Sequence, residues 1–244
     1  FKKMLTYNKN DMTTTTKKLA ICIPTCSYGR NWEKIYDSLL VEIFLNTIVK
    51  NQPDYEIDVF IGYNEDDRLF NNFDNRTLVG ALLVNTKINL KWFSFDDNYK
   101  GKPTWIWNKL VKNAIDEGHE YFFCCGDDIA FPKDKYWADV LIKSLKKNLN
   151  KGIAGGDSGN PNLPMTQFMF HKNHYLINGF VFPPSIHNWF CDNWIQEVYS
   201  LNNIFYFPNL KFLNSGGDPR YVPKDDRKLC SLLVKRHKND YHHA

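Results

Sequence analysis

The sequence of 244 residues lacks several features that would assign a chain to a common class of protein at once. It has no apolar run long enough to span a membrane and no recognisable secretory signal peptide. None of its six cysteines has zinc-finger spacing, because Cys22 and Cys26 have no second pair to match them. Neither a GxxxxGK[ST] loop nor a GxGxxG fingerprint occurs, which removes the support for P-loop and Rossmann cofactor sites.

The chain also lacks a large excess of positive or negative charge. The chain has 31 Lys and Arg against 27 Asp and Glu, a formal net charge of +4. This balance is too mild to argue for nucleic-acid binding, but it suits an anionic small molecule such as a nucleotide diphosphate. Cys22, Cys124 and Cys125 lie inside apolar runs, where a free thiol behaves as a small hydrophobic group. Reduced thiols and the lack of a signal peptide lead us to expect a cytoplasmic protein with no transmembrane segment.

The composition that is present fits a globular protein. Hydrophobic residues make up 43% of the chain and charged residues 24%, so the chain can bury a full core without disulfides. Aromatic residues reach 16%. Some of them belong to the core, and others are suited to stacking on nucleobases or sugar rings.

Strand and helix patterns alternate along the chain after a polar segment, residues 1–17, which we expect to be flexible. Short apolar runs predict strands at residues 19–23, 57–61, 90–95 and 121–125, and helical periodicity predicts helices at 32–48, 78–84, 103–118 and 135–149. This order predicts an α/β fold with a mostly parallel central sheet flanked by helices, in a single domain. The second half is less regular, with the following expected elements: a glycine-rich loop at 155–161, a strand at 168–170, a helix at 189–199, an edge strand at 205–212 and a terminal helix at 225–237.

Ligands of open parallel sheets bind beyond the carboxyl ends of the strands, and two adjacent carboxylates, Asp127 and Asp128, follow the predicted strand 121–125 directly. Two buried like charges repel each other, so a positive group should lie beside them. A hard cation such as Mn²⁺ or Mg²⁺ is the first interpretation. The alternative is that the pair caps the helix that follows.

Other candidate residues have weaker support. Glu65, Asp66 and Asp67 follow the second strand, either as ligands for a ribose or base or as a solvated turn. Lys100 and Lys102 precede a helix that begins at Pro103, where a lysine can meet a phosphate or simply lie at the surface.

Trp189 and Trp194 lie on either side of Asp192, which suits a sugar-stacking wall with a catalytic base, or else a helix cap with core aromatics. His171 and His174 have ligand-like spacing, and His187 lies near Asp192 in sequence, but ordinary structural roles are expected for all three.

Three segments of the sequence resemble GT-A glycosyltransferases, notably the family 2 type. KLAICIPT (residues 18–25) resembles the opening strand of that fold, and FFCCGDDIAF (122–131) resembles its strand and DXD-type metal motif. FPPSIHNWFCDNWIQEVY (182–199) resembles an acceptor-side segment. The resemblance implies that residues 18–244 form a GT-A-type Rossmann-like domain, with residues 18–130 binding the nucleotide sugar and residues 131–244 binding the acceptor.

The resemblance also implies roles for individual residues. Pro24 and Thr25 would line the nucleotide pocket, and Asp66 would face the base or ribose. Asp127 would approach the ribose or donor sugar, with Asp128 as the metal ligand and Asp127 as a possible second one. Asp192 would be the catalytic base of an inverting enzyme. Two departures stand out, since the motif is Gly-Asp-Asp rather than Asp-x-Asp, and Cys191-Asp192 replaces the usual Glu-Asp pair.

The predicted function is therefore transfer of a sugar from a nucleotide diphosphate donor, with UDP implied by the resemblance, to a glycan or other hydroxyl acceptor. Lys102 and a divalent ion would take up charge on the leaving diphosphate. Two alternatives stay open. A sugar nucleotidyltransferase would carry a glycine-rich basic loop after the first strand, and residues 26–30 are poor in both. A non-catalytic carbohydrate-binding domain would have no need of Asp127 and Asp128.

Overall fold

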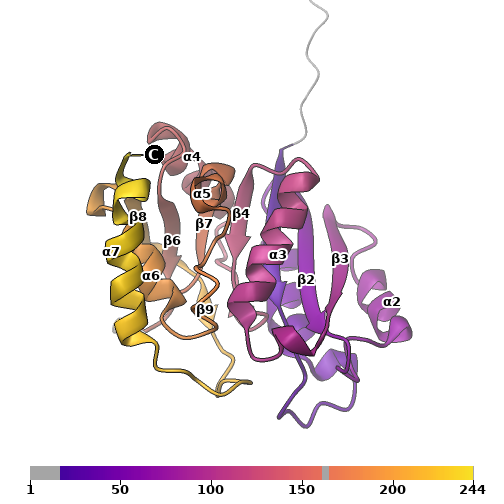
Figure 1. The fold of residues 1–244 in the computed structure, drawn as a ribbon. Helices are drawn as coiled ribbons and strands as arrows, with labels where there is room; N and C mark the ends of the chain where they lie inside the picture. Colours follow the sequence, from indigo (N-terminus) through magenta and orange to yellow (C-terminus); the bar gives the residue numbers. More distant parts are fainter. Residues whose placement is uncertain (1–16, 161–164, 244) are drawn as a thin grey trace, which may run out of the picture.

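The computed structural model describes residues 17–160 and 165–243. The predicted flexible segment, residues 1–17, lies outside the described residues except for Lys17, whose carbonyl oxygen accepts a hydrogen bond from the Glu56 N–H at 2.9 Å. The described chain folds around a seven-stranded sheet in the order β3-β2-β1-β4-β7-β6-β8 (Figure 1). Its strands are β1 (Lys18–Pro24), β2 (Glu56–Asn64), β3 (Ile88–Phe95), β4 (Tyr121–Cys124), β6 (Ile153–Asp157), β7 (Phe168–His171) and β8 (Ile204–Lys211).

The predicted α/β class is confirmed. β1, β2, β3 and β4 are mutually parallel, whereas β7 runs antiparallel to both of its neighbours, β4 and β6. β8 pairs with β6 in parallel. A separate two-stranded ribbon joins β5 (Ile129–Ala130) to β9 (Leu213–Asn214), and neither strand was predicted. This ribbon brings the chain from the end of β8 back to the residues just after Asp128.

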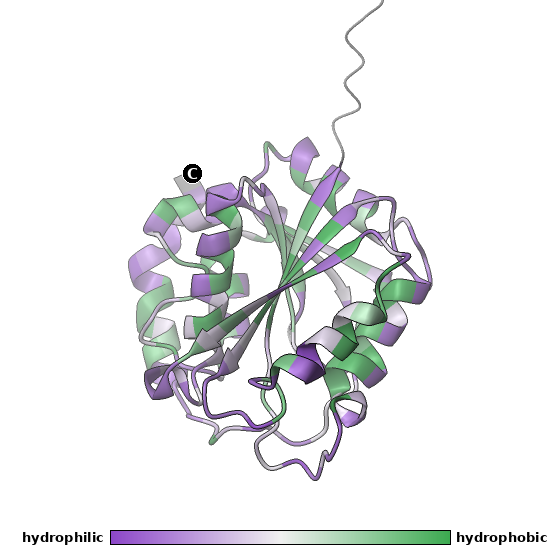
Figure 2. Ribbon diagram, turned by 90° about the vertical axis from the view of Figure 1, so that its right-hand side faces the viewer, coloured by the Kyte–Doolittle hydropathy of each residue, from purple (hydrophilic) through white to green (hydrophobic). Residues whose placement is uncertain are grey.

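Helices cover both faces of the sheet (Figure 2). The helices are α1 (Asn46–Lys50), α2 (Phe73–Ala81), α3 (Pro103–Asp116), α4 (Trp137–Lys147), α5 (Lys172–Asn178), α6 (Cys191–Val198) and α7 (Arg227–His243). Four further helical segments are η1 (Ile35–Asp37), η2 (Leu40–Leu45), η3 (Asp97–Tyr99) and η4 (Leu201–Asn203). The single helix predicted over residues 32–48 is thus a 3-10 turn, a π-helical segment and the short α1 in succession. Among the described residues no helix is both long and apolar enough to cross a bilayer.

Alternate side chains of the strands enter two separate cores because successive residues of a strand point to opposite faces. Leu19, Ile21 and Ile23 of β1 pack in the core that contains α4 and the helical segments after β1. Ala20 and Cys22 pack in the other core, which contains α3, α6 and α7. Both faces of β1 are fully buried, which explains why its sequence is a continuous apolar run rather than an alternating one.

The predicted glycine-rich loop at residues 155–161 is wrong for its first part, because Gly155 and Gly156 belong to β6. A Cβ on Gly155 would lie 2.4 Å from the Met165 sulfur, and one on Gly156 would lie 2.0 Å from the Leu210 carbonyl oxygen. The glycines therefore permit close packing within the sheet, at an irregularity in the pairing of β6 with β8.

Candidate functional site

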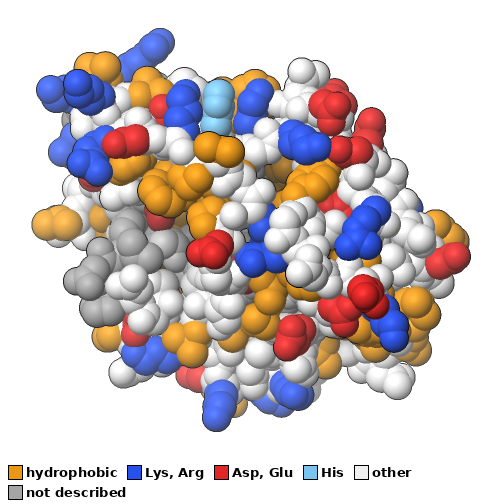
Figure 3. Space-filling view, turned by 90° about the horizontal axis from the view of Figure 1, so that it is seen from below, with side chains coloured by type: hydrophobic (Ala, Val, Ile, Leu, Met, Phe, Trp, Pro, Cys, Tyr) orange, Lys and Arg blue, Asp and Glu red, His pale blue; other side chains and the backbone are white. Residues whose placement is uncertain are grey.

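The parallel strands β1, β2 and β4 end at one edge of the sheet, and the loops that follow them meet there. The backbone pairing continues past the strand ends, since the Thr25 N–H donates to the Gly62 carbonyl (2.8 Å) and the Cys125 N–H donates to the Cys22 carbonyl (3.3 Å). A fourth segment without regular structure, residues 215–224, crosses this edge between β9 and α7; we call it the crossing segment. Figure 3 views the molecule from this side, where acidic, basic and hydrophobic side chains are interspersed.

Asp127 is fully buried at this edge, and both of its carboxylate oxygens have donors. The Thr25 hydroxyl donates to Oδ2 at 2.5 Å, and Arg220 Nη1 donates to the same oxygen at 2.6 Å. The second guanidinium nitrogen of Arg220, Nη2, forms a close ion pair with Oδ1. Arg220 Nη1 also donates to the Cys26 carbonyl at 2.9 Å. The positive group that two adjacent carboxylates require is therefore supplied to Asp127 by Arg220.

The Asp128 carboxylate, unlike that of Asp127, lacks such donors in the described part of the chain. Among the described residues, no other residue donates a hydrogen bond to its carboxylate. Burial raises the pKa of this carboxyl to about 6, and the negative charge of Asp127 adds to the rise, while Arg220 and Arg30 oppose it. The charge of Asp128 is thus poorly compensated by the protein itself.

Two glycines make room for the Asp128 carboxylate. A Cβ on Gly216 would lie 1.7 Å from Asp128 Oδ2, and one on Gly126 would lie 2.4 Å from Oδ1. The Ser215 N–H donates to the Asp128 carbonyl at 3.0 Å, which fixes Gly216 against the side chain. Mg²⁺-type ions are usually held by one or two carboxylates together with substrate phosphates and water. An oxygen ligand of this kind, with no donor from another described residue and with two glycines packed against it, fits such an ion.

Asp192 lies in the first turn of α6, two residues after a strained residue. Phe190 has a φ of +70°, a left-handed conformation that is rare for a bulky side chain and that tends to occur at functional sites. The Asp192 Oδ1 accepts one hydrogen bond, from the Asn193 N–H at 3.2 Å. Burial raises the pKa of the Asp192 carboxyl, so this group too is short of stabilising donors.

Tyr221 of the crossing segment connects the two carboxylates electrostatically. Burial raises the pKa of its phenol, and the nearby Cys191, Asp192 and Asp128 raise it further. Its Cβ lies 3.8 Å from the position that a Cβ on Gly101 would take. Asp128 and Asp192, which are 64 residues apart in the sequence (192 − 128), thus both act on the Tyr221 phenol by raising its pKa.

The neighbouring residues Asp66 and Asp67 differ in burial and in hydrogen-bond partners. Asp67 is fully buried and accepts hydrogen bonds from the Ser27 N–H (2.6 Å), the Ser27 hydroxyl (2.9 Å) and the N–H groups of Leu69 and Phe70 (both 3.0 Å). This carboxylate joins the loop after β1 to the loop after β2, and it is a structural residue.

Asp66 is half-exposed at the outer end of the same two loops. It pairs with Lys100 at 2.6 Å and accepts a close hydrogen bond from the Tyr28 hydroxyl. The hydrogen bond from Lys100, followed by that from Tyr28, lowers the pKa of the Asp66 carboxyl. The Lys100 ammonium also lies 4.4 Å from the centroid of the Tyr28 ring. Asp66 therefore lies on the side of the predicted nucleotide half, in a small polar cluster of its own.

The structure does not place Lys102 beside the predicted acidic site residues. Its ammonium lies 4.0 Å from the centroid of the Trp105 ring, and Trp105 packs edge-on against His187 at 5.4 Å between ring centroids. Pro103 occupies the first turn of α3, as predicted, with Lys102 at the N-cap.

The histidine pair His171 and His174 has structural roles. Both ring nitrogens of buried His174 have partners, the Tyr199 hydroxyl at 2.8 Å and the Val181 carbonyl at 2.9 Å. Burial lowers the pKa of His174 to about 4, so its ring is neutral. His171 caps α5 by accepting a hydrogen bond from the Asn173 N–H.

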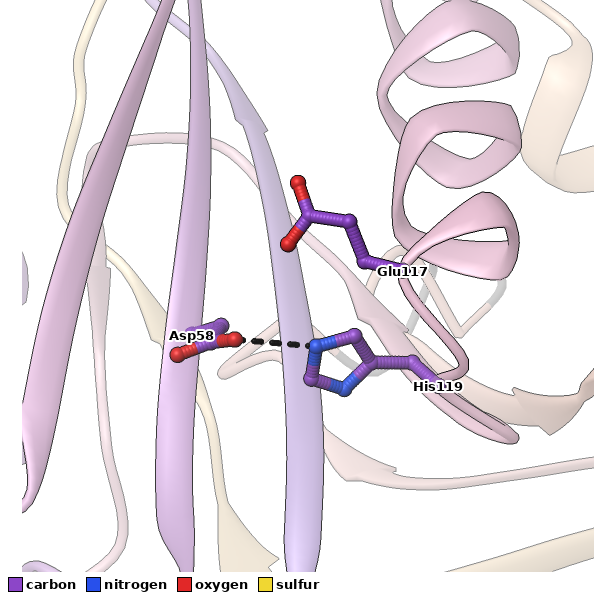
Figure 4. Close-up of side chains that lie close together, drawn as sticks. All are labelled: Asp58, Glu117 and His119. Atoms are coloured by element: carbon purple, nitrogen blue, oxygen red, sulfur yellow. Dashed lines mark hydrogen bonds and ion pairs between the residues drawn. The ribbon is translucent and has the colours of Figure 1, made fainter.

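A different group of side chains, Asp58, Glu117 and His119, has the proximity needed to hold a metal ion, with ligand atoms within 4.8 Å of one another (Figure 4). It lies at the amino-terminal end of β2, on the opposite edge of the sheet. The Lys91 ammonium already lies 2.8 Å from Asp58 Oδ2 and forms a close ion pair with Glu117. A cation from the protein thus occupies this group, which had no signal in the sequence because its residues are far apart in the chain.

A surface groove of about 580 Å³ lies between α2 and the edge strand β3, and its lining includes Phe73, Arg76, Val84 and Trp92. It contains none of the predicted site residues.

The candidate site residues lie instead in the loops at the strand ends, where Arg220 is a functional candidate that sequence reasoning missed altogether. Arg220 follows Gly216-Gly217-Asp218-Pro219, a stretch that predicts only a turn.

Comparison with known proteins shows the fold. No protein-family model matches the chain, and no curated protein matches it in sequence. The structure is similar to that of S. aureus TarS residues 1–349, with a TM-score of 0.57 and 15% identity, over 90% of this chain and 65% of that one. It is also similar to the inositol-1-phosphate CTP transferase from T. maritima, with a TM-score of 0.50 and 13% identity, over 90% of this chain and 96% of that one. The chain thus spans about two thirds of the TarS structure and has the Rossmann-like fold of GT-A and nucleotidyltransferase proteins.

Proposed function

We propose that the chain is a GT-A-type glycosyltransferase that uses Mn²⁺ or Mg²⁺ to transfer a sugar from a UDP-sugar to a hydroxyl acceptor with inversion. The observation that carries the proposal is the Asp128 carboxylate, a half-buried acid with a raised pKa and no donor from another described residue, held between two glycines at the carboxyl end of β4. A protein has little reason to keep such a charge unless a bound cation completes its surroundings.

The residues of the site fit distinct roles in this reaction. Thr25, Pro24 and the half-exposed Asp66 line the end of the sheet on the side of β1 and β2, where the nucleotide would lie. Asp128 would hold the metal ion, which when bound neutralises charge on the donor diphosphate. Asp127 would contact the ribose or donor sugar. The positive charges of Arg220 and Arg30 act on Asp128 by lowering its pKa.

Asp192 would act as the general base. Because burial raises its pKa, the ionised carboxylate is a stronger proton acceptor than an exposed one. As the acceptor oxygen attacks the anomeric carbon, its proton passes to Asp192 and the bond from that carbon to the diphosphate oxygen breaks, with the electron pair leaving on the diphosphate. No covalent sugar–enzyme intermediate is needed, and positioning and charge stabilisation supply the rate enhancement.

A thermal-shift experiment tests the proposal. UDP, GDP, CDP, ADP and dTDP would be added to the parent chain, each with Mn²⁺ and with EDTA. A ligand that binds only the folded state raises the melting temperature by mass action. We expect UDP to raise it with Mn²⁺ and not with EDTA, and Asp128→Ala to lose this response.

The matched control is Asp58→Asn, which removes a buried carboxylate at the opposite edge of the sheet and should keep the UDP response. If no nucleotide stabilises the parent in the presence of metal, the proposal is wrong. Stabilisation by CTP or UTP together with a sugar phosphate, but not by a nucleotide diphosphate, would instead favour a nucleotidyltransferase. The fold is compatible with that activity, whereas residues 26–30 lack the glycine-rich basic loop expected for it.

A further inference from the structure

Polar contacts hold the crossing segment over the site near both of its ends. The Arg30 guanidinium donates to the carbonyl oxygens of Gly216 (2.8 Å) and Asp218 (2.7 Å). At the far end, the Asn188 side chain donates to the Val222 carbonyl at 3.3 Å and accepts from the Lys224 N–H at 3.1 Å. Of residues 215–224, only Gly216 is buried. A segment with so little buried apolar surface can move at a low free-energy cost.

The pair between Arg220 and Asp127 is the exception to this loose attachment. The Asp127 side chain is fully buried and that of Arg220 is 13% exposed, so both charges are largely removed from water. The guanidinium also lies 5.7 Å from the centroid of the Trp32 ring. Removing one member of such a pair leaves the other as an uncompensated buried charge.

This pairing conflicts with the role proposed for Asp127. The Asp127 side chain is fully buried, and both of its oxygens accept hydrogen bonds from Thr25 or Arg220. A ribose or sugar hydroxyl therefore reaches Asp127 only after Arg220 has moved away. Arg220 in turn leaves Asp127 only if it finds another anion, because its guanidinium would otherwise be unpaired. The diphosphate of the donor is such an anion, and its oxygens match the two-pronged geometry of a guanidinium as well as a carboxylate does.

We propose that Arg220 is a donor-positioning residue that exchanges the Asp127 carboxylate for the phosphate oxygens of the donor as the donor enters. This inference rests on the proposed function. The exchange frees Asp127 for the hydroxyls of the donor and moves the crossing segment with it. A nucleoside without phosphates must break the same ion pair and offers Arg220 nothing in return, so phosphate-bearing ligands are selected.

Binding of UDP and of uridine, both with Mn²⁺ and measured by calorimetry, tests the exchange in the parent and in Arg220→Gln. We expect Arg220→Gln to weaken UDP binding about tenfold or more, the loss of a charge-assisted contact, and to leave uridine binding equal or tighter. Arg220→Lys should recover part of the UDP affinity. Arg76→Gln is the matched control, because this arginine of α2 is bound to Tyr63 and to the Phe70 carbonyl away from the site.

A purely structural role would weaken both ligands alike in Arg220→Gln, and that result would overturn the exchange. Tighter binding of UDP in Arg220→Gln would overturn it too, because Arg220 would then only block the site. A parent that binds neither ligand overturns the proposed function together with this inference.

A second readout needs no arginine variant. Movement of Arg220 away from Trp32 should change the tryptophan emission of the parent on addition of UDP, less so with uridine, and this change should be absent in Trp32→Phe. An emission change that is the same for UDP and uridine contradicts the exchange.

Discussion

Replacement of Asp128 by Asn should make the protein more stable, although it removes a residue of the proposed site. The pKa of the Asp128 carboxyl is about 6 in the folded chain, against an ordinary value of 3.8. A difference of one in pKa corresponds to about 1.4 kcal/mol, so the ionised carboxylate destabilises the folded state by about 3 kcal/mol at pH 8. An amide must also be buried, which makes this figure an upper limit for the gain in Asp128→Asn.

The sign of the pH dependence follows from the raised pKa. A carboxyl whose pKa is higher in the folded than in the unfolded chain binds more protons when folded, so its destabilising effect is absent below about pH 4. The effect grows as the pH rises toward 6 and is complete above it. The difference in unfolding free energy between Asp128→Asn and the parent should therefore be near zero at pH 4 and reach its full value at pH 8.

Urea unfolding at pH 4, 6 and 8, followed by circular dichroism in EDTA, measures this difference from the midpoints. Asp58→Asn is an instructive control because the pKa of the Asp58 carboxyl is shifted in the opposite direction. Burial alone would raise the pKa of Asp58, but hydrogen bonds from Lys91, Asn89 and His119 prevail and lower it. Asp58→Asn should therefore destabilise the chain at pH 8. A variant Asp128→Asn that is less stable than the parent at pH 8, or equally altered at all three pH values, would refute the reasoning.

Two further predictions concern the same site. Asp192→Asn should abolish sugar transfer while keeping the Mn²⁺-dependent thermal shift with UDP, because Asp192 is proposed to act on the acceptor and not on the donor; a lost UDP shift in a folded variant would contradict this assignment. Gly216→Ala should remove most of the UDP response, because its Cβ would lie 1.7 Å from Asp128 Oδ2 and must displace the carboxylate. Gly217→Ala adds a Cβ with no atom within 4 Å but places alanine at a φ of +70°, so it should keep the UDP response at a cost in stability; loss of the response in both variants would contradict the role of the Gly216 contact.

Much of the fold was predictable because its determinants are local. The apolar runs of β1, β2 and β4 are long enough and sufficiently free of polar residues to indicate buried parallel strands, and Pro103 marked the start of α3. The antiparallel β7 and the short pair β5 and β9 depend on which distant segments meet, and four or fewer residues carry too little pattern to reveal that. Gly155 and Gly156 suggested a loop because close packing between strands leaves the same signature as a turn.

The site was predictable to a similar extent. The position of Asp127 and Asp128 at a strand end follows from the sequence, since an apolar strand runs directly into them. Their unequal surroundings do not, because Arg220 comes from a segment with no periodicity and reaches Asp127 only through the tertiary fold. The same is true of the separation of Asp66 from Asp67, which differ in burial and partners although they are neighbours in the chain.

The contact of Arg220 with the loop after β1 has a consequence for the order of events during synthesis. The Cys26 carbonyl and the Arg220 guanidinium that bind each other are 194 positions apart. Domains fold as the chain emerges from the ribosome, with the amino-terminal part first. A nascent chain that has formed β1 to β4 already carries Thr25, Asp127 and Asp128, but it lacks Arg220, which neutralises Asp127. In such an intermediate the Asp127 carboxylate has the Thr25 hydroxyl as a donor but no cation beside it, so the strand end cannot reach its final arrangement until the crossing segment has been made.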